Sequence, residues 1–561
     1  MKNFIPATLL CDFYKVSHKD QYPKGTEVVY STWTPRSNKY FPQANEVVTF
    51  GIQGFVKEFL IEFFNEQFFN RPKEDVVAEY KRILTHTLGA EPDTFHIEEL
   101  HDLGHLPIEI KALPEGTLAP IKTPMLTVEN TDSRFFWIPN YLETIISNLI
   151  WQPMTSATIS YQYRKLLDEY AMKTVGHTND VGFQGHDFSM RGMGGLDATL
   201  SSGAAHLLSF TGTDTIPAIM YHERFYNANV EKELVGASIP ATEHSVMSAN
   251  TSADHRDEYE TFKRLITEVY PKGFVSIVSD TYDFWKVIGE VIPALKEDIL
   301  KRDGKVVIRP DSGTPEDIIC GKDIPEYESI VMAEEHLLNE VWEEAREANT
   351  LTELVKLYKV DGKFYTKKYE IEYQYHPENK DGVIVTPHPS EKYTPSIEEL
   401  GLIEALYNIF GGTVTEKGYK VLDSHIGAIY GDSITLERAR TIVERLEAKG
   451  FASINIVLGI GSYTFQYNTR DTLGFAMKAT YSVVNGEEKL LFKDPKTDDG
   501  TKRSQRGRVH VSRVNGEIKF VDGLTKNTVV KTPDLLQTVF KDGQLLRDES
   551  LQEIRQRLLN N

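Results

Sequence analysis

The sequence has almost no cysteine. Cys11 and Cys320 are the two cysteines in 561 residues. Two cysteines are too few for a disulfide framework, or for a metal site built from thiolates at the usual spacing. A reducing, cytoplasmic setting is therefore expected.

The sequence also lacks an excess of basic residues and any long apolar run. It has 62 Lys and Arg against 82 Asp and Glu, a formal net charge of −20 and a pI near 5.4. Because nucleic-acid backbones are bound by basic surfaces, this balance argues against nucleic acid as a partner. No apolar run approaches membrane-spanning length, and residues 1–10 lack the features of a signal peptide. An anionic small molecule can still be bound where cations gather locally.

What the sequence does have is a series of short apolar segments that end in polar turns. In residues 306–313, three branched residues are followed by Arg-Pro-Asp-Ser-Gly, and segments 275–279, 425–430 and 454–458 end in a similar way. Such segments, alternating with helical spacers, indicate parallel strands in an α/β fold, an irregular (β/α) barrel of the TIM-like type. In such barrels the active site lies at the strand ends.

Two domains are expected from the length. Residues 1–150, together with 472–561, predict a β-rich α+β domain, although 534–540 resembles a closing helix. Residues 151–471 predict the catalytic barrel. An interruption at about 320–396 contains an amphipathic helix and an exposed strand, which indicates a surface insertion that serves as a partner contact or a lid.

An aromatic residue, an arginine and an aspartate lie in two closely spaced turns. Phe188 and Arg191 belong to the first turn, and Asp214 follows a strand predicted at 207–210. These side chains could hold a flat polar heterocycle, with Phe188 stacking on it and the other two hydrogen-bonding to its edge. Alternatively, Arg191 and Asp214 form a structural ion pair. The sequence alone favours neither interpretation.

A histidine next to a carboxylate follows another small-residue segment. His244 comes directly after Glu243. A histidine titrates near neutrality and can act as base, acid or nucleophile, and a nearby carboxylate can raise its basicity. Most histidines are structural, but the position of His244 at a strand end favours a functional role.

Two short turns rich in small residues are suited to phosphate. They are Gly431-Asp432-Ser433 and Gly459-Ile460-Gly461-Ser462, and their backbone N–H groups could cradle an anion. Either turn alone is a weak signal. Both follow the turn of residues 309–313, and together they favour a ligand that carries phosphate. The basic cluster at 502–508 is either a solvated surface or a site that recruits pyrophosphate or ATP.

These turns together resemble one family, the nicotinamide phosphoribosyltransferases, which have the type II phosphoribosyltransferase fold. The resemblance runs in order along nearly the whole chain outside the insertion. It includes Asp12-Phe13-Tyr14-Lys15-Val16, residues 105–112, His186-Asp187-Phe188, Gly212-Thr213-Asp214-Thr215, Glu243-His244-Ser245, residues 308–313, Gly431-Asp432 and residues 492–495.

The resemblance implies transfer of 5-phosphoribose from phosphoribosyl pyrophosphate (PRPP) to nicotinamide, giving nicotinamide mononucleotide and pyrophosphate for NAD salvage. It implies that nicotinamide lies between Phe188 and Tyr14, with Tyr14 coming from the other subunit of a homodimer. Asp12 is also expected to bind nicotinamide. Asp214 is then expected to accept a hydrogen bond from the carboxamide, and Arg191 to donate one to it.

The resemblance also implies a phosphate site and a coupling to ATP. The residues expected to bind PRPP or phosphate are Arg36, Arg309, Asp311, Gly431, Asp432, Gly461, Ser462, Arg470, Lys478 and Lys493. His244 is expected to be phosphorylated by ATP, and Glu243, His244 and Asp311 are the expected catalytic residues. Mg²⁺ is the expected metal, held mainly by pyrophosphate.

Two alternatives remain at this point. The chain resembles nicotinate phosphoribosyltransferases as well, and Asp214 distinguishes the two activities because an ionised carboxylate repels nicotinate. A non-catalytic binding protein with the same fold would be expected to lose catalytic positions, and none is lost here. Ser462 and Tyr463 depart from the more glycine-rich family turn and could narrow the phosphate cradle.

Overall fold

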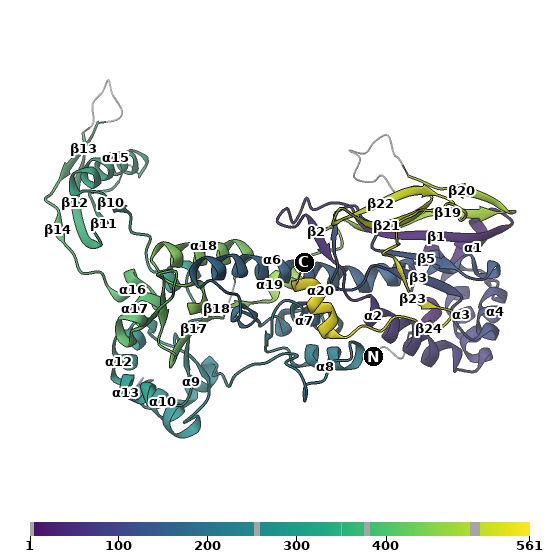
Figure 1. The fold of residues 1–561 in the computed structure, drawn as a ribbon, viewed down its shortest axis with the longest axis horizontal. Coiled ribbons are helices and arrows are strands. Elements are labelled where there is room, and N and C mark those ends of the chain that lie inside the picture. The colour runs from purple at the N-terminus through teal and green to yellow at the C-terminus, as the bar shows by residue number, and fades with distance from the viewer. Residues whose placement is uncertain are drawn as a thin grey trace.

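The protein is described by a computed structural model covering residues 5–251, 258–348, 350–374, 382–431, 434–493 and 505–560. Its elements form an elongated arrangement (Figure 1). An antiparallel sheet lies at one end, a parallel sheet lies nearer the other, and a small lobe projects beyond it. Within the described ranges, no helix is long and apolar enough to cross a membrane.

Strands from both ends of the chain build the larger sheet. It has seven strands in the order β20-β19-β1-β5-β3-β23-β24, and all neighbouring pairs are antiparallel. The bounds are β1 Thr26–Pro35, β3 Ile108–Ala112, β5 Leu126–Asn130, β19 Phe475–Val484, β20 Glu487–Leu490, β23 Gln537–Lys541 and β24 Gln544–Leu545. The helix predicted at 534–540 is therefore wrong, because residues 537–541 form β23, which pairs with β3 and β24.

The two faces of this sheet are covered differently. In β3, Ile108, Ile110 and Ala112 are fully buried, while Glu109 and Lys111 point to the opposite face. The apolar face packs on helices that include α3 (Lys73–Leu88) and α4 (Phe95–Leu103). The polar face is partly covered by a hairpin of β21 (Arg508–Val514) and β22 (Glu517–Leu524), which lies above β1 and β19 in Figure 1.

The second sheet is parallel and positions the candidate site. Its order is β7-β6-β18-β17-β9-β8, and the predicted α/β class is confirmed. The bounds are β6 Gly185–Asp187, β7 Gly212–Thr213, β8 Val275–Val278, β9 Val306–Arg309, β17 Ile426–Tyr430 and β18 Ile456–Ile460. All residues of β8 and β17 are buried, as expected for parallel strands covered on both sides.

A short segment connects the two edge strands of the parallel sheet. Ala237 forms a parallel bridge with Gly212, next to β7, and Ala241 forms one with Ser276 of β8. The N–H of Thr242 also donates to the Ser276 carbonyl at 3.0 Å. The sheet therefore curls enough for residues 237–241 to reach both of its edges.

Two predicted boundaries near this sheet are corrected. Residues 207–210 do not form a strand, because α7 (Leu196–His206) runs into a turn there and the strand is β7. Gly459 and Ile460 belong to β18 and not to a turn, because they pair with His186 and Asp187 of β6.

One helix contributes to the cores of both sheets. Helix α6 (Glu143–Thr174) has 32 residues and is therefore about 48 Å long. Ile146 and Ile150 in its first half belong to the core beside the antiparallel sheet. Tyr163 and Leu167 in its second half belong to the core around the parallel sheet. Figure 1 shows α6 running between the two sheets, so it fixes their relative positions.

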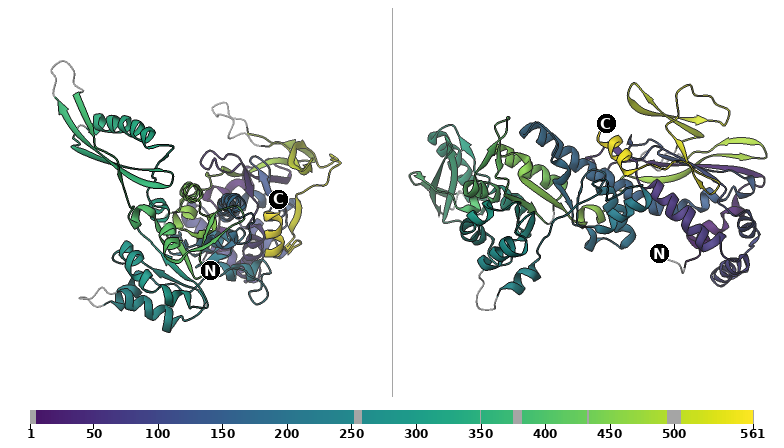
Figure 2. Two further views of the ribbon diagram at one scale, coloured as in Figure 1. Left: turned by 60° about the vertical axis from the view of Figure 1, so that its left-hand side comes forward. Right: turned by 60° about the horizontal axis from the view of Figure 1, so that its bottom comes forward.

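The segment predicted as an insertion forms a small lobe with its own core. Helix α15 (Ile330–Ala348) packs Leu337 and Val341 against Tyr358 and Tyr369 of a small sheet. The strands are β10 Glu326–Tyr327, β11 Glu353–Val360, β12 Lys363–Gln374, β13 Gly382–Pro387 and β14 Glu391–Lys392. In both views of Figure 2 this lobe lies away from the antiparallel sheet.

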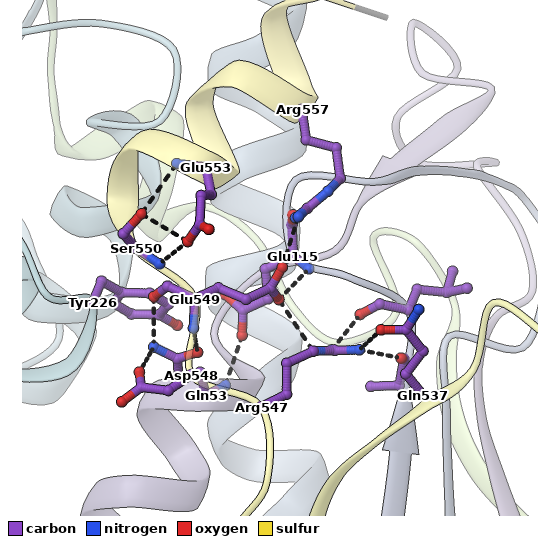
Figure 3. A network of polar contacts seen from close by, with 12 residues as sticks. Gln53, Glu115, Tyr226, Gln537, Arg547, Asp548, Glu549, Ser550, Glu553 and Arg557 are labelled. Atoms are coloured by element: carbon purple, nitrogen blue, oxygen red, sulfur yellow. Dashed lines mark hydrogen bonds and ion pairs between the residues drawn. The ribbon is translucent and has the colours of Figure 1, made fainter.

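The C-terminal segment is tied to the N-terminal part of the chain by a buried polar network (Figure 3). Glu115 accepts hydrogen bonds from the N–H groups of Gly51 and Gln53, and its own N–H donates to Glu549 at 3.1 Å. Burial, and then the charge of Glu549, raise the pKa of Glu115 to about 7. Arg557 forms an ion pair with Glu549 at 2.8 Å. The helix α20 (Leu551–Leu559) is thereby held against the body of the protein.

Candidate active site

The polar turns predicted from the sequence lie along one edge of the parallel sheet. Parallel strands carry their C-terminal ends at the same edge. The side chains or turns that follow these ends are Phe188 after β6, Asp214 after β7, Asp280 after β8, Asp311 after β9, Gly431 after β17 and Gly461 after β18. Asp432 lies outside the described residues.

A cavity of about 550 Å³ lies at this edge. Phe188, Arg191 and Asp214 all line it, together with residues of α7 and the turn before it. Apolar neighbours such as Met193 and Leu196 complete the lining. A concave site with an aromatic ring, a guanidinium and a carboxylate suits a small, flat, polar ligand.

Asp214 is held by two groups that were not predicted as site residues. His186 Nε2 lies 2.8 Å from Asp214 Oδ1, and Ser238 Oγ donates to the same oxygen at 2.6 Å. Burial alone would raise the pKa of Asp214, but the hydrogen bonds from His186 and Ser238 outweigh it and lower the pKa below its ordinary value. Asp214 is therefore ionised at neutral pH. Its partners are not Arg191, so the alternative of a structural pair between them is wrong for the described residues.

Close backbone packing holds Phe188 at the cavity. Its N–H donates to the Ile460 carbonyl at 3.0 Å, and its ring lies 4.5 Å from the His186 ring. A Cβ atom at Gly459 would lie 2.8 Å from Phe188 Cδ2 and 2.5 Å from the Tyr430 carbonyl. Glycine at position 459 therefore leaves the space that the Phe188 ring needs.

His244 faces two aspartates and not its neighbour Glu243. His244 Nε2 lies 3.8 Å from both Asp280 Oδ1 and Asp311 Oδ2, and Nδ1 lies 3.2 Å from Thr281 Oγ1. Glu243 instead accepts a hydrogen bond from Ser245. In this structure no direct contact between Glu243 and His244 supports the expectation that Glu243 raises the basicity of His244.

Asp280 organises the turn after β9. Its side chain is 4% exposed, and its Oδ2 accepts hydrogen bonds from Asp311 N at 2.8 Å and Ser312 Oγ at 2.6 Å. The carboxylate of Asp280 therefore orients Asp311 while its other oxygen faces His244. Asp280 directly follows a predicted strand, and this position in the sequence could have identified it as a site residue.

The other described residues of the predicted phosphate site at this edge are Arg309, Gly431, Gly461 and Ser462. Arg309 Nη2 donates to the Thr242 carbonyl at 2.5 Å, and Gly431 packs directly against Asp311. Ser462 lies against Gly192, whose added Cβ would meet its side chain. A Cβ added at Gly461 would meet no heavy atom of the described chain within 4 Å, so the space above this turn is open.

Five other predicted residues lie at the antiparallel sheet. They are Asp12, Tyr14, Arg36, Arg470 and Lys478. Lys478 on β19 and the buried Lys15 both pair with Glu143, at 3.7 Å and 2.6 Å. Burial, and then the charges of nearby Arg36, Lys15 and Arg470, lower the pKa of Lys478 against the opposing effect of Glu143.

The aromatic side chain of this second group is open to solvent. Tyr14 is 58% exposed, and it does not line the cavity that contains Phe188. Asp12 accepts a hydrogen bond from Thr144 Oγ1 at 2.7 Å, and Lys493 is exposed beyond β20. Figure 1 places β1 and β19 well apart from β17 and β18. One chain therefore does not bring Tyr14 and Phe188 together.

Comparisons with known proteins agree with this arrangement. Residues 183–368 and 379–544 match the nicotinate phosphoribosyltransferase family, and residues 7–110 match the N-terminal domain of nicotinamide phosphoribosyltransferases. The chain belongs to the nicotinate phosphoribosyltransferase family. The resemblance stated from the sequence motifs is thereby confirmed.

Full-length relatives support the same family membership. A nicotinamide phosphoribosyltransferase of Acinetobacter baylyi is 45% identical over 98% of this chain and 96% of its own length. One of Xanthomonas campestris pv. campestris is 30% identical over 97% of this chain and 96% of its own length. Both alignments include the edge of the parallel sheet and the antiparallel sheet.

A solved structure has a similar fold. Nicotinate-nucleotide pyrophosphorylase from Pyrococcus furiosus superposes with a TM-score of 0.50 at 14% identity, covering 99% of this chain and 94% of its own. At this identity the likeness concerns the fold alone. Family membership and fold therefore rest on independent comparisons.

Proposed function

We propose that the chain transfers 5-phosphoribose from PRPP to nicotinamide, giving nicotinamide mononucleotide and pyrophosphate. The observation that carries this proposal is the ionised Asp214 in a cavity that also contains Phe188 and Arg191. The names of the Acinetobacter and Xanthomonas relatives support it. The curled parallel sheet, with residues 237–241 reaching both of its edges, supports the irregular (β/α) barrel of a type II phosphoribosyltransferase.

The cavity residues would hold the pyridine ring and select its substituent. The Phe188 ring offers a stacking surface. Asp214 Oδ1 is engaged by His186 and Ser238, which leaves Oδ2 to accept a hydrogen bond from a carboxamide N–H. Arg191 would donate to the carboxamide oxygen. A carboxylate in place of the amide would bring two negative charges together, so this geometry favours nicotinamide over nicotinate.

The displacement needs no nucleophile from the protein. The lone pair of the nicotinamide ring nitrogen forms the new bond to ribose C1, and the electrons of the breaking C1–O bond leave with pyrophosphate. Positive charge develops on the ribose, which Asp311 can stabilise, while Arg309 contacts phosphate. Asp280 positions Asp311 through the hydrogen bonds to its N–H and to Ser312.

Mg²⁺ would assist departure of pyrophosphate by neutralising its charge. Among the described residues, no group of three or more His, Cys, Asp or Glu side chains is arranged to hold a metal ion. Asp280 and Asp311 offer two carboxylates near His244, so further oxygen ligands would come from pyrophosphate itself.

His244 is proposed to couple ATP to the reaction. The imidazole nitrogen would form a bond to the γ-phosphorus of ATP as the bond from that phosphorus to the β-phosphate oxygen breaks and ADP leaves. Water would later break the N–P bond and release phosphate. His244 is 48% exposed, and its Nε2 faces Asp280 and Asp311. The same turn that positions Asp311 for the ribose therefore lies beside the proposed phosphohistidine, which gives a physical link between the two reactions.

The complete site is proposed to form between two copies of the chain. Lys478 lies on β19 of the antiparallel sheet, and Tyr14, Arg36, Arg470 and Lys478 do not line the cavity of the same chain. Apolar side chains are exposed at both places: Phe13 and Tyr14 at the first, and Met190, Leu196, Ile216 and Met220 around the cavity. A homodimer would cover both surfaces and bring Tyr14 of one chain to Phe188 of the other.

The function is tested by a competition assay with PRPP and Mg²⁺. Nicotinamide and nicotinate are offered together, with and without ATP, and the two mononucleotides are separated by chromatography. Nicotinamide mononucleotide as the main product, increased by ATP, supports the proposal. The alternative is nicotinate phosphoribosyltransferase activity, for which nicotinate mononucleotide would be the main product.

Asp214→Asn is expected to weaken the preference for nicotinamide at least about tenfold. The asparagine keeps an acceptor oxygen but removes a charge whose repulsion of nicotinate is worth several kcal/mol in a partly buried site. The ratio of kcat/KM for the two substrates measures this effect. Because the pKa of Asp214 is lowered, the wild-type preference should stay constant from pH 6 upward.

Asp197→Asn is the matched control for this prediction. Asp197 lies in the first turn of α7 and is not part of the cavity lining. It should leave the substrate ratio unchanged. Equal ratios in the wild type and Asp214→Asn would contradict the role given to Asp214.

Gly459→Ala is expected to raise the KM for nicotinamide about tenfold or more. The added Cβ displaces Phe188, because the opposing Tyr430 carbonyl cannot move away easily. Misplacing a binding group by about 1 Å can cost roughly a hundredfold in rate. Gly427→Ala in the neighbouring β17 is the control, since its Cβ would meet the flexible Lys305 side chain at 3.1 Å. Equal KM values in both variants would argue against stacking on Phe188.

A further inference from the structure

A second cavity lies on the polar face of the antiparallel sheet, under the β21–β22 hairpin. Its volume is about 220 Å³. Tyr30, Lys111 and Thr127 line it from the sheet, while Arg508 and Lys526 line it from the hairpin and the loop that follows. None of these residues belongs to the proposed catalytic site.

The acidic side chains of this cavity already have donors. Glu129 pairs with Arg508. Asp534 accepts hydrogen bonds from the N–H groups of Val511 at 3.2 Å and Leu536 at 3.0 Å. The third acidic residue, Glu109, accepts one from Thr538 Oγ1 at 3.0 Å. Each carboxylate of the cavity therefore has at least one donor within the protein.

Two lysine side chains of the cavity, by contrast, lack a hydrogen-bonding partner within the described ranges. Among the described residues, no acceptor lies within hydrogen-bonding or ion-pair distance of the ammonium group of Lys111 or Lys526. Arg508 Nε is likewise buried without an acceptor in the described chain. The cavity thus contains charged donors that have no acceptor in the described chain, in a protein whose net charge is −20.

We propose that this cavity binds a small oxyanion such as inorganic phosphate through Lys111 and Lys526. A ligand that carries acceptors and negative charge satisfies these donors. The hydroxyl groups of Thr127 and Thr528, which also line the cavity, can donate to further oxygens. The volume suits an ion of this size with some bound water.

The proposed oxyanion site is separate from the cations of the proposed PRPP site, although Lys111 and Lys478 lie on the same face of the antiparallel sheet. Opposed residues form a row across four strands, with Lys111 beside Thr127, Thr127 beside Thr32 and Thr32 beside Lys478. Three strand spacings place Lys111 about 14 Å from Lys478. This exceeds the Debye length of about 8 Å at physiological ionic strength, so an anion in the cavity is held by the local lysines.

The proposal is tested by crystallography with selenate, a tetrahedral oxyanion whose selenium gives an anomalous signal. Crystals of the full chain are grown without phosphate or sulfate and then soaked in selenate. An anomalous peak is expected in the cavity of the wild type, absent in the variant Lys111→Gln/Lys526→Gln and retained in Lys519→Gln. Lys519 is the control because it lies on the same hairpin, pairs with Glu517 and does not line the cavity.

A solution measurement accompanies the crystals. Inorganic phosphate is titrated while the melting temperature is followed, which reports binding without any assay of catalysis. Each lost charged hydrogen bond is expected to raise the Kd at least about tenfold. No peak in the wild-type cavity, or equal selenate occupancy and equal phosphate affinity in the double variant, would overturn the proposal. The selenate result does not depend on the reaction at the parallel sheet, because the crystal shows the two sites separately.

Discussion

Replacing His244 by glutamine is expected to abolish the ATP dependence of the reaction while leaving phosphoribosyl transfer in place. Glutamine has similar size but no ring nitrogen that can carry a phosphoryl group. The ring nitrogen of nicotinamide remains the nucleophile toward ribose, so the displacement itself does not require His244. ATP hydrolysis should fall at least about a hundredfold, since the covalent intermediate cannot form.

Three measurements on one preparation separate these steps. Product formation without ATP, product formation with ATP, and labelling of the protein from ATP carrying a radioactive γ-phosphate are compared. The wild type should carry acid-labile label, and His244→Gln should carry none. Ser245→Ala is the control, because Ser245 hydrogen-bonds to Glu243 and not to His244. ATP stimulation that persists in His244→Gln would refute the phosphohistidine.

The positions of several site residues could be predicted because they depend on local sequence. Phe188, Asp214 and Asp311 each follow a short buried segment, and parallel strands place such ends at one edge. Asp280 also follows a short buried segment, but the residues next to it form no distinctive motif. Its role depends on a hydrogen bond to Asp311 across the sheet, which no local pattern encodes.

Other features depend on contacts between distant parts of the chain. His186 and Ser238 meet at Asp214 because the strand register brings three separate segments together. The segment at 534–540 resembles a closing helix in sequence, but residues 537–541 pair with β3 and form a strand. Lys15 and Glu143 are far apart in sequence and meet beside Lys478. In each case tertiary packing determines which residues meet or which local structure forms, and a single sequence does not show this packing.

The separation of the two residue groups was expected from the family resemblance and not from local sequence, and it leads to the second large effect. Two inactive variants are expected to restore activity when they form a mixed dimer. Tyr14→Ala/Lys478→Ala damages the group on the antiparallel sheet, and Asp214→Ala/Arg309→Ala damages the group at the cavity. If each site takes one group from each chain, a mixed dimer contains one site with both groups intact.

Co-expression with two different affinity tags, followed by purification through both, yields only mixed dimers. Their activity should be about half that of the wild type, because one of the two sites in a symmetric dimer is restored. The control pairs Tyr14→Ala/Lys478→Ala with Arg36→Ala/Arg470→Ala. These variants damage the same group, so each site of their mixed dimer keeps a damaged contributor and stays inactive. Absence of recovery in the first pair, from a stable dimer, would mean that each site is complete within one chain. Tyr14 would then have to reach Phe188 by a rearrangement of the two sheets, which the shared helix α6 opposes.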